Sequence, residues 1–189
     1  MFPLMHLFYS VEVQGQERLT GLRGPVLFAA NHNIKMDNPL IIMAMPFGWR
    51  WRLSVAAAAD DIFGNRLWQI AAPLLGNGFP FSREGAVRPS LEHLGRLMDQ
   101  GWSVLIYPEG HNSYGEMDSF KPGAGMVAVE SRSPIVPLRV RLSKAGVWDG
   151  AGPGARGTVE IRFGEALTFP RRTDYRQATE QIEAAVRAL

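Results

Sequence analysis

The stretch VLFAANHNIKMDNP, residues 26–39, joins a continuous apolar run to a polar segment that contains His32 and Asp37. The run Val26–Ala30 predicts a strand buried on both faces of a sheet. Asn38 and Pro39 predict that a helix starts close by, because proline suits the first helical turn. A buried strand that leads through a polar loop into a helix is typical of an α/β fold.

The rest of the chain repeats this alternation of strands and helices. Further strands are predicted at Val104–Tyr107, Ile135–Val140 and Val159–Phe163, of which the last alternates and belongs nearer an edge of the sheet. Helices are predicted at residues 89–98 (ended by Gly101), Gly123–Ser131, Asp60–Ala72 and from an N-cap at Thr173 to the C-terminus, with a glycine-rich surface loop at 144–157. We therefore expect an α/β fold with a mostly parallel or mixed central sheet flanked by helices.

Length and composition fit one globular domain, residues 1–189, either whole or excised from a longer chain. The chain has no cysteine, which excludes disulfides and thiolate metal sites, and its scattered histidines predict no metal centre. A formal net charge of +2 does not indicate a nucleic-acid partner. No cofactor is expected.

Two stretches, 1–9 and 43–51, are rich in aromatic residues and methionine. The longest apolar run, Pro39–Phe47, is too short to cross a bilayer, which takes roughly 20 residues. The N-terminus lacks a basic region and a small-residue cleavage site, so no signal peptide is predicted. The two stretches either pack in the core or lie in a membrane interface, where Arg50 and Arg52 would help.

His32 and Asp37 are the first candidates for chemistry. On one regular helix their five-residue spacing would place them roughly 140° apart, so they could not serve one site. If His32 lies in the loop and Asp37 in the first helical turn, the carboxylate can accept from one imidazole nitrogen. The other nitrogen would then be free to act as a base. By itself this pair is weak evidence for catalysis and is more typical of a structural histidine. Asn31 is expected to support the loop.

A second polar segment, PEGHNS at residues 108–113, follows the next buried strand. Ligands of open α/β sheets gather at the carboxyl ends of the strands, so Glu109 is expected close to His32 and Asp37. Arg83 is a candidate anion contact or a solvated surface residue. Lys121 precedes a glycine-containing helix start that could hold a phosphate or serve helix packing.

Four ordered blocks of this sequence resemble the glycerolipid acyltransferases of the lysophosphatidic acid acyltransferase type. The blocks are NHNIKMD (31–37), GFPFSR (78–83), YPEGHNS (107–113) and PIVPLRV (134–140), and their order and spacing match from about Val13 to Leu167. The resemblance implies a glycerol-phosphate acyltransferase-like fold. It also implies transfer of a fatty acyl group from acyl-CoA or acyl carrier protein to a hydroxyl of a lysophospholipid such as 1-acylglycerol-3-phosphate.

The resemblance also implies residue roles. His32 would be the general base and Asp37 the residue that orients it, with the alkoxide attacking the thioester directly. Substrate binding would fall to Arg83, Glu109, Gly110, His111, Asn112, Lys121 and Pro137. The implied partners are the acyl donor, the lysophospholipid and a membrane surface, and the implied location is cytoplasmic, peripherally on the inner face of a membrane.

The third block departs from the family pattern at three positions, of which the last two bear on acceptor binding. The family usually reads Phe-Pro-Glu-Gly-Thr-Arg-Ser, whereas His111 and Asn112 stand here for the threonine and the arginine. A charged hydrogen bond contributes about 1.5–3 kcal/mol, so replacing arginine by a neutral amide weakens the case for a phosphate-bearing acceptor, unless His111, Lys121 or Arg139 compensates. Two other functions stay open: an acyl-thioester hydrolase with the same His–Asp pair, and a non-catalytic module that binds lipid or acyl-CoA.

Overall fold

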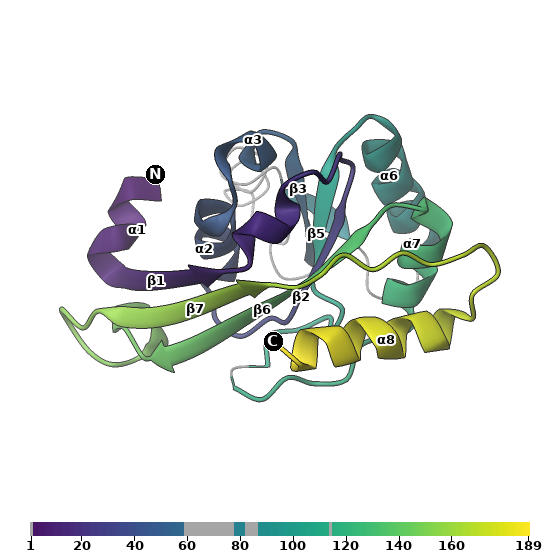
Figure 1. The fold of residues 1–189 in the computed structure, drawn as a ribbon. Coiled ribbons are helices and arrows are strands. Elements are labelled where there is room, and N and C mark those ends of the chain that lie inside the picture. The colour runs from purple at the N-terminus through teal and green to yellow at the C-terminus, as the bar shows by residue number, and fades with distance from the viewer. Residues whose placement is uncertain (1, 59–77, 82–86, 114) are drawn as a thin grey trace.

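A mixed seven-stranded sheet with helices on both faces forms the described part of the chain (Figure 1). The computed structural model describes residues 2–58, 78–81, 87–113 and 115–189. The strands are β1 (Tyr9–Gln14), β2 (Leu27–Ala30), β3 (Leu53–Ala58), β4 (Gly78–Phe81), β5 (Ser103–Ile106), β6 (Ile135–Lys144) and β7 (Gly157–Phe163). The helices are α1 (Phe2–Phe8), α2 (Asp37–Ala44), α3 (Phe47–Arg50), α6 (Val87–Asp99), α7 (Gly123–Ser131) and α8 (Tyr175–Arg187), with short 3-10 turns η1 (Gln16–Leu19) and η2 (Val147–Asp149).

The sheet order is β1-β7-β6-β2-β5-β3-β4. All neighbouring strands pair in parallel except β6 and β7, which are antiparallel. This confirms the predicted mixed α/β sheet. β2 lies between β6 and β5, and the chain leaves the carboxyl ends of β2 and β5 on the same edge.

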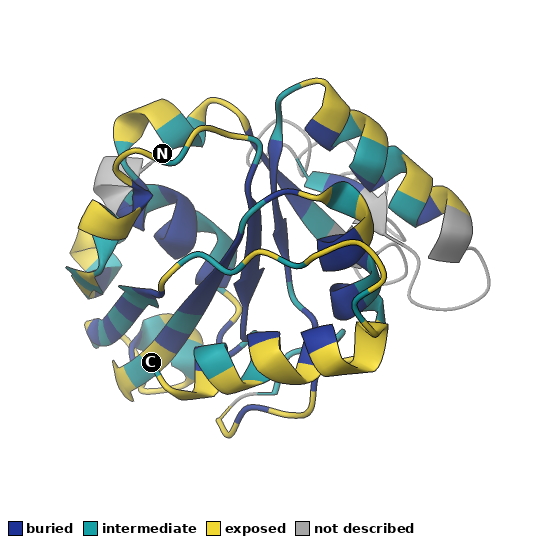
Figure 2. Cartoon of the chain, turned by 45° about the vertical axis from the view of Figure 1, so that its right-hand side comes forward, coloured by how far each residue is buried: buried dark blue, intermediate teal, exposed yellow. Residues whose placement is uncertain are grey.

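Two hydrophobic cores lie on the two faces of the sheet. Every residue of β2 and β5 is buried, which confirms the continuous apolar pattern (Figure 2). Phe28 and Ala30 face the core beneath α2, whereas Leu27 and Ala29 face the core covered by α6, α7 and α8. Alternate residues of one strand therefore hold both helical layers in place.

Three strands were not predicted, and each lacks a strong local signal. β1 has only one fully buried position, Tyr9, because it lies at an edge of the sheet. β3 reads LSVAAA and β4 reads GFPF, and alanine, glycine and proline are all uncommon in strands. Their positions follow from pairing with β5 and with each other rather than from intrinsic preference.

The helix predictions hold for α6, α7 and α8, with one correction at an N-cap. Thr173 was expected to cap α8, but the cap is Asp174, whose carboxylate accepts from the backbone N–H of Gln177 at 2.9 Å. The Thr173 hydroxyl instead donates to the carbonyl of Pro170 at 2.7 Å. The loop expected at 144–157 contains η2, and the helix expected at Asp60–Ala72 lies outside the described residues. In the described residues, every helix is too short or too polar to span a bilayer.

Gly125 allows the backbones of α7 and α8 to approach each other closely. A Cβ at this position would lie 1.9 Å from the carbonyl oxygen of Tyr175. The backbone N–H of Gly125 donates to the Thr179 hydroxyl at 3.0 Å. The sequence left two roles open for the glycines at this helix start, phosphate binding and helix packing. For Gly125 the structure supports helix packing.

We predict that Gly125→Ala lowers the free energy of unfolding by about 3 kcal/mol, because the methyl group forces the two helices apart. Gly95→Ala is the matched control, since Gly95 also lies within a helix, α6, but has nothing within 4 Å of its added Cβ. The free energy of unfolding of the control should rise by about 1 kcal/mol, because alanine has a higher helix propensity than glycine. Urea unfolding followed by circular dichroism measures both, and equal effects of the two substitutions would contradict the packing argument.

Candidate active site

The polar residues of the first and third blocks meet at the carboxyl ends of β2 and β5. His32 comes two positions after Ala30, the end of β2, and Glu109 comes three positions after Ile106, the end of β5. The backbone N–H of His32 donates to Glu109 Oε1 at 2.7 Å. The expectation that the two segments share one edge of the sheet is therefore confirmed.

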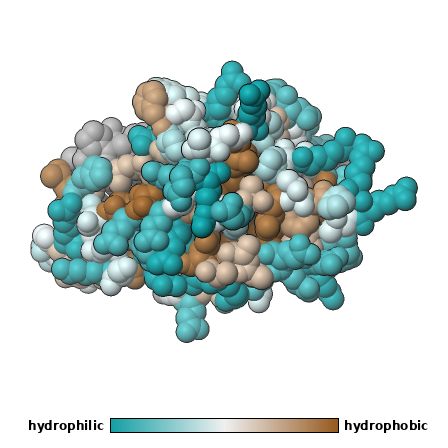
Figure 3. All heavy atoms as spheres, viewed as in Figure 1, coloured by the Kyte–Doolittle hydropathy of each residue, from teal (hydrophilic) through white to brown (hydrophobic). Residues whose placement is uncertain are grey.

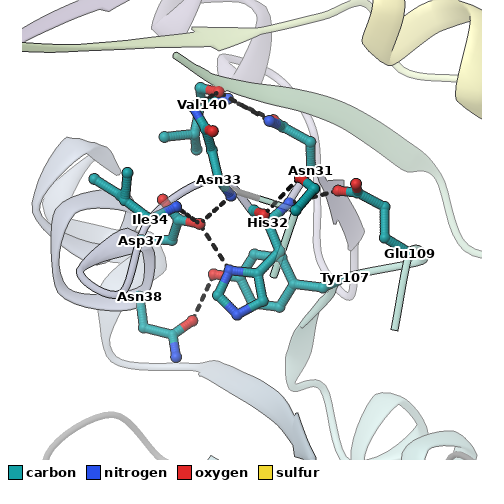
Figure 4. A network of polar contacts seen from close by, with 10 residues as sticks. Asn31, His32, Asn33, Ile34, Asp37, Asn38, Tyr107, Glu109 and Val140 are labelled. Atoms are coloured by element: carbon teal, nitrogen blue, oxygen red, sulfur yellow. Dashed lines mark hydrogen bonds and ion pairs between the residues drawn. The ribbon is translucent and has the colours of Figure 1, made fainter. Parts of the chain in front are cut away.

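His32 and Asp37 are in direct contact (Figure 4). His32 Nδ1 lies 2.8 Å from Asp37 Oδ2. Asp37 is the first residue of α2, so the pair joins a loop to a helix start, as the spacing predicts. The same Oδ2 accepts from the backbone N–H groups of Asn33 at 2.7 Å and Ile34 at 3.1 Å. One carboxylate oxygen thus fixes both the loop and the imidazole.

The two members of the pair differ in exposure. The Asp37 side chain is 0% exposed, and its Oδ1 has no hydrogen-bond partner among the described residues. Burial raises the pKa of the Asp37 carboxyl above its ordinary value, and the bonds from His32 and the loop backbone oppose that rise only in part. The His32 side chain is 25% exposed, and within the described residues its Nε2 has no partner. Nε2 is therefore the nitrogen available to a substrate.

Glu109 is buried, at 1% exposure, and both of its carboxylate oxygens accept backbone N–H groups. Oε1 accepts from His32, and Oε2 accepts from Asp118 at 2.8 Å. The Ser113 hydroxyl and backbone N–H donate to the carbonyl of His32 at 3.0 and 2.9 Å, which ties the same two segments again. The carboxylate expected to line the acceptor pocket is thus used to join the loop of His32 to the loop at 113–118.

Tyr107 is a site residue that the sequence reasoning did not single out. Its ring stacks on the imidazole of His32, with centroids 4.3 Å apart and an interplanar angle of 23°. Its hydroxyl donates to Asn38 Oδ1 at 2.5 Å. The signal in the sequence is a tyrosine where the family block usually begins with phenylalanine.

Asn31 pairs with β6 and so supports the loop, as expected. Its Nδ2 donates to the carbonyl of Val140 at 2.9 Å, and its Oδ1 accepts from the N–H of the same residue at 2.7 Å. Asn33 Nδ2 also approaches that carbonyl, at 3.4 Å. The side chain of Asn31 therefore continues the pairing of β2 with β6 beyond the end of β2.

The residues of the third block that follow the buried Glu109 lie nearer the protein surface. Gly110 has φ +77°, a left-handed conformation, and a Cβ added to it would lie only 2.9 Å from Lys121 Nζ, so glycine leaves room for the ammonium. His111 is exposed, with Nε2 2.8 Å from Asp118 Oδ2 and Nδ1 3.2 Å from the carbonyl of Glu109. Asn112 is half-buried beside it. Gly110, His111 and Lys121 thus cluster around the turn that follows Glu109.

Three further residues considered from the sequence lie away from this turn or outside the described residues. Pro137 is buried within β6, where it pairs with Ala29 of β2 and its ring lies beside Gly164. Arg139, considered as a compensating cation, donates to the carbonyls of Val186 and Arg187 at the end of α8. Arg83 lies outside the described residues. Within the described residues, no group of three His, Asp or Glu side chains could hold a metal ion.

We predict that Asp37→Asn changes the pH dependence of folding stability. A folded-state pKa above the unfolded value means that wild-type stability falls as pH rises through the range just above the ordinary carboxyl pKa. The variant lacks this loss, so its stability relative to wild type should be greater at pH 7 than at pH 4. Urea unfolding at the two pH values measures the difference, and a relative stability that is greater at pH 4 would contradict the prediction. Asp99→Asn, on the exposed end of α6, is the control and should change stability by less than about 0.5 kcal/mol.

Comparisons with known proteins agree with the four blocks. Residues 10–141 match the family described as Acyltransferase. A chloroplastic 1-acyl-sn-glycerol-3-phosphate acyltransferase of Brassica napus is 24% identical over 132 residues, which cover 69% of this chain and 37% of that protein. A second one, of Arabidopsis thaliana, is 25% identical over 69% of this chain and 36% of its own length. The chain thus spans little more than a third of these two relatives.

Two further proteins are similar over almost the whole chain. A lyso-ornithine lipid O-acyltransferase of Pseudomonas aeruginosa is 26% identical, with 95% of this chain and 71% of that protein covered. The crystal structure of a 1-acyl-sn-glycerophosphate acyltransferase from Thermotoga maritima has a TM-score of 0.67 and 23% identity, with 97% of this chain and 73% of that chain covered, which shows a shared fold. Since the family match extends over well more than half of its residues, the chain belongs to the Acyltransferase family.

Proposed function

We propose that this protein transfers a fatty acyl group from an acyl thioester, acyl-CoA or acyl carrier protein, to a hydroxyl of a lysophospholipid such as 1-acylglycerol-3-phosphate. The observation that carries the proposal is the His32–Asp37 contact of 2.8 Å, with Nε2 of His32 left open. A histidine whose Nδ1 donates to a buried carboxylate presents an Nε2 lone pair, which is what a general base requires.

In the proposed reaction, the acceptor hydroxyl gives its proton to His32 Nε2 as its oxygen bonds to the thioester carbonyl carbon. The carbonyl electron pair moves onto the carbonyl oxygen, and its return breaks the carbon–sulfur bond. The thiolate that leaves takes the proton from Nε2, so His32 ends the cycle neutral. Asp37 stabilises the imidazolium and holds the ring orientation throughout.

The acceptor would lie beside the turn that follows Glu109. Lys121 would bind the acceptor's anionic group, and its ammonium beside Gly110 supports this role. Arg83, His111 and Asn112 would contribute further contacts, as the resemblance implies. Glu109 would position the two loops rather than contact the acceptor, because its oxygens already accept the backbone N–H groups of both loops. No cofactor takes part.

A second acceptor class, a lyso-ornithine lipid, is favoured by one specific observation. Asn112 stands where the family arginine would clamp a phosphate, and an ornithine headgroup bears a carboxylate and an amine instead of a phosphate. The relative named for that acceptor also aligns with 95% of this chain. The exposed carboxylate of Asp118 lies at the same turn and could receive an amine.

We also propose that the protein binds the cytoplasmic face of a membrane through the side of the sheet covered by α1, α2 and α3. Phe47 is the first residue of α3 and Trp51 directly follows it. Each is 68% exposed, and the two rings contact each other edge to face with centroids 5.6 Å apart. Leu7 of α1 is also 68% exposed. Other apolar groups reach the face shown in Figure 3 in separate patches among hydrophilic side chains. Exposed aromatic residues of this kind are typical of an interfacial contact.

Of the two arginines expected to assist membrane binding, one donates to backbone carbonyls within the fold and the other is exposed. Arg50 donates to the carbonyls of Met43 at 2.7 Å and Met45 at 2.8 Å, so its guanidinium caps the end of α2. Arg52 is exposed and remains a candidate contact for anionic headgroups.

We predict that His32→Ala lowers acyl transfer at least a hundredfold, because the general base is lost. Thiol release from palmitoyl-CoA, dispersed in detergent, is measured with 1-acylglycerol-3-phosphate, with lyso-ornithine lipid and with no acceptor. His6→Ala, on the exposed side of α1, is the control and should match wild type. Acceptor-dependent release supports the transferase and identifies the acceptor class, whereas equal release without acceptor would indicate the hydrolase. If wild type releases no thiol in any arm, the proposed catalysis is wrong.

We predict that the double substitution Phe47→Ser, Trp51→Ser lowers the affinity for vesicles about tenfold or more, because two exposed aromatic side chains no longer enter the interface. Co-sedimentation with vesicles of anionic and zwitterionic phospholipid measures the bound fraction. Tyr175→Ser, an exposed aromatic on the opposite side of the sheet at the start of α8, is the matched control. Unchanged binding of the double variant would refute this docking side.

A further inference from the structure

Tyr107 and Asn38 form a hydrogen-bonded pair that has no role in the acyl transfer proposed above. The Tyr107 ring lies parallel to His32, and its hydroxyl extends past the imidazole to Asn38 Oδ1 (Figure 4). Asn38 follows Asp37 in the first turn of α2. Tyr107 directly follows β5 and Asn38 lies in α2, so the pair closes one side of the His–Asp contact.

The direction of this hydrogen bond fixes the Asn38 carboxamide. Burial, and then the charge of Asp37, raise the pKa of Tyr107, so its hydroxyl keeps its proton at neutral pH and acts as the donor. The acceptor must then be the amide oxygen, which leaves the NH₂ group on the other side. Among the described residues, Asn38 Nδ2 has no hydrogen-bond partner.

The free amide nitrogen and the free imidazole nitrogen face the same way. In Figure 4, Asn38 Nδ2 and the ring nitrogen of His32 that does not contact Asp37 both point away from the Asp37 carboxylate. Asn38 is half-buried, so a neutral donor is held at the boundary between the protein interior and the space in front of His32. Such a donor suits an oxygen on which charge develops during reaction.

We propose that Asn38 Nδ2 donates a hydrogen bond to the carbonyl oxygen of the acyl thioester as negative charge develops on it, and that Tyr107 positions the carboxamide for this contact. The inference rests on the proposed acyl transfer. Asn38 neither gives nor takes a proton. His32 moves the proton from the acceptor hydroxyl to the leaving thiolate, while Asn38 stabilises the oxygen that carries the charge between bond formation and carbon–sulfur cleavage.

The roles predict a specific pattern of kinetic effects. Asn38→Ala should lower kcat about a hundredfold with little change in KM for the acyl donor, since the bond strengthens only in the transition state. Tyr107→Phe keeps the ring that stacks on His32 but frees the carboxamide, and should lower kcat about tenfold. The double variant should be no slower than Asn38→Ala alone, because Tyr107 acts through Asn38. Asn38→Asp keeps an oxygen for Tyr107 but lacks the donor, so it should be at least as slow as Asn38→Ala.

The test is steady-state kinetics of the full chain with palmitoyl-CoA and the acceptor on which wild type is active. Tyr175→Phe is the matched control, since it removes a tyrosine hydroxyl that donates to Glu130 at 2.6 Å on the surface, and its kcat should be unchanged. Thermal unfolding of each variant shows whether it is folded, and Tyr107→Phe, which loses one oxygen, tests the proposal even where Asn38 variants do not fold. The pH profile of kcat should keep its midpoint, because neither side chain titrates near neutral pH.

Three results would overturn the inference: a kcat for Asn38→Ala within threefold of wild type, multiplicative effects in the double variant, or an effect confined to the KM of the acceptor. These results require an active wild type. An inactive wild type, or a His32→Ala variant as active as wild type, would refute the proposed acyl transfer instead, so the two failures are distinguishable.

Discussion

The bond from the backbone N–H of His32 to the buried carboxylate of Glu109 holds the site together. His32 and Glu109 are 77 positions apart, and each follows the end of a central strand. Burying a carboxylate is costly unless its oxygens are hydrogen-bonded, and here each oxygen accepts a backbone N–H from a different loop. Charge-assisted bonds of this type are stronger than neutral ones. The loop of His32 is therefore held by a backbone hydrogen bond that does not depend on the imidazole side chain.

Asp37 adds the second constraint, and its two oxygens are used unequally. Oδ2 receives the imidazole and two backbone N–H groups, whereas Oδ1 has no partner in the described part of the chain. Three bonds on one oxygen favour the ionised carboxyl, and burial opposes it. An ionised Asp37 requires a proton on His32 Nδ1, so the lone pair of the neutral ring lies at Nε2. Burying the charge of Asp37 costs stability. The same charge fixes the His32 tautomer with its lone pair on Nε2, which is the tautomer that a general base needs.

The sequence predicts the centre of this fold well and its edges poorly. β2, β5 and the first part of β6 are buried on both faces, so their apolar runs identify them without reference to the rest of the chain. β3 and β4 depend on pairing with a neighbour, which leaves no periodic pattern. The His32–Asp37 contact was predictable, since their spacing excludes one regular helix and Pro39 places the helix start between them. The use of Glu109 as a brace was not, because a side chain that binds backbone groups of a distant loop carries no sequence signal.

The cations of the sequence illustrate the same limit. Arg50 and Arg139 read as free positive charges, yet each guanidinium donates to the last carbonyls of a helix, α2 or α8. Positive charge at a helix C-terminus is favourable because the carbonyl dipoles point there. Burial lowers the pKa of Arg139, and so do the neighbouring cations Arg141 and Arg187, while Glu109 raises it. Both guanidiniums are thus used within the fold, so a count of basic residues overstates how many cations are free to bind an anion, and Asn112 in place of the family arginine adds none. If the turn after Glu109 binds the acceptor, as we propose, Lys121 and the carboxylate of Asp118 would offer it one charge of each sign, which suits a headgroup less anionic than a phosphate monoester.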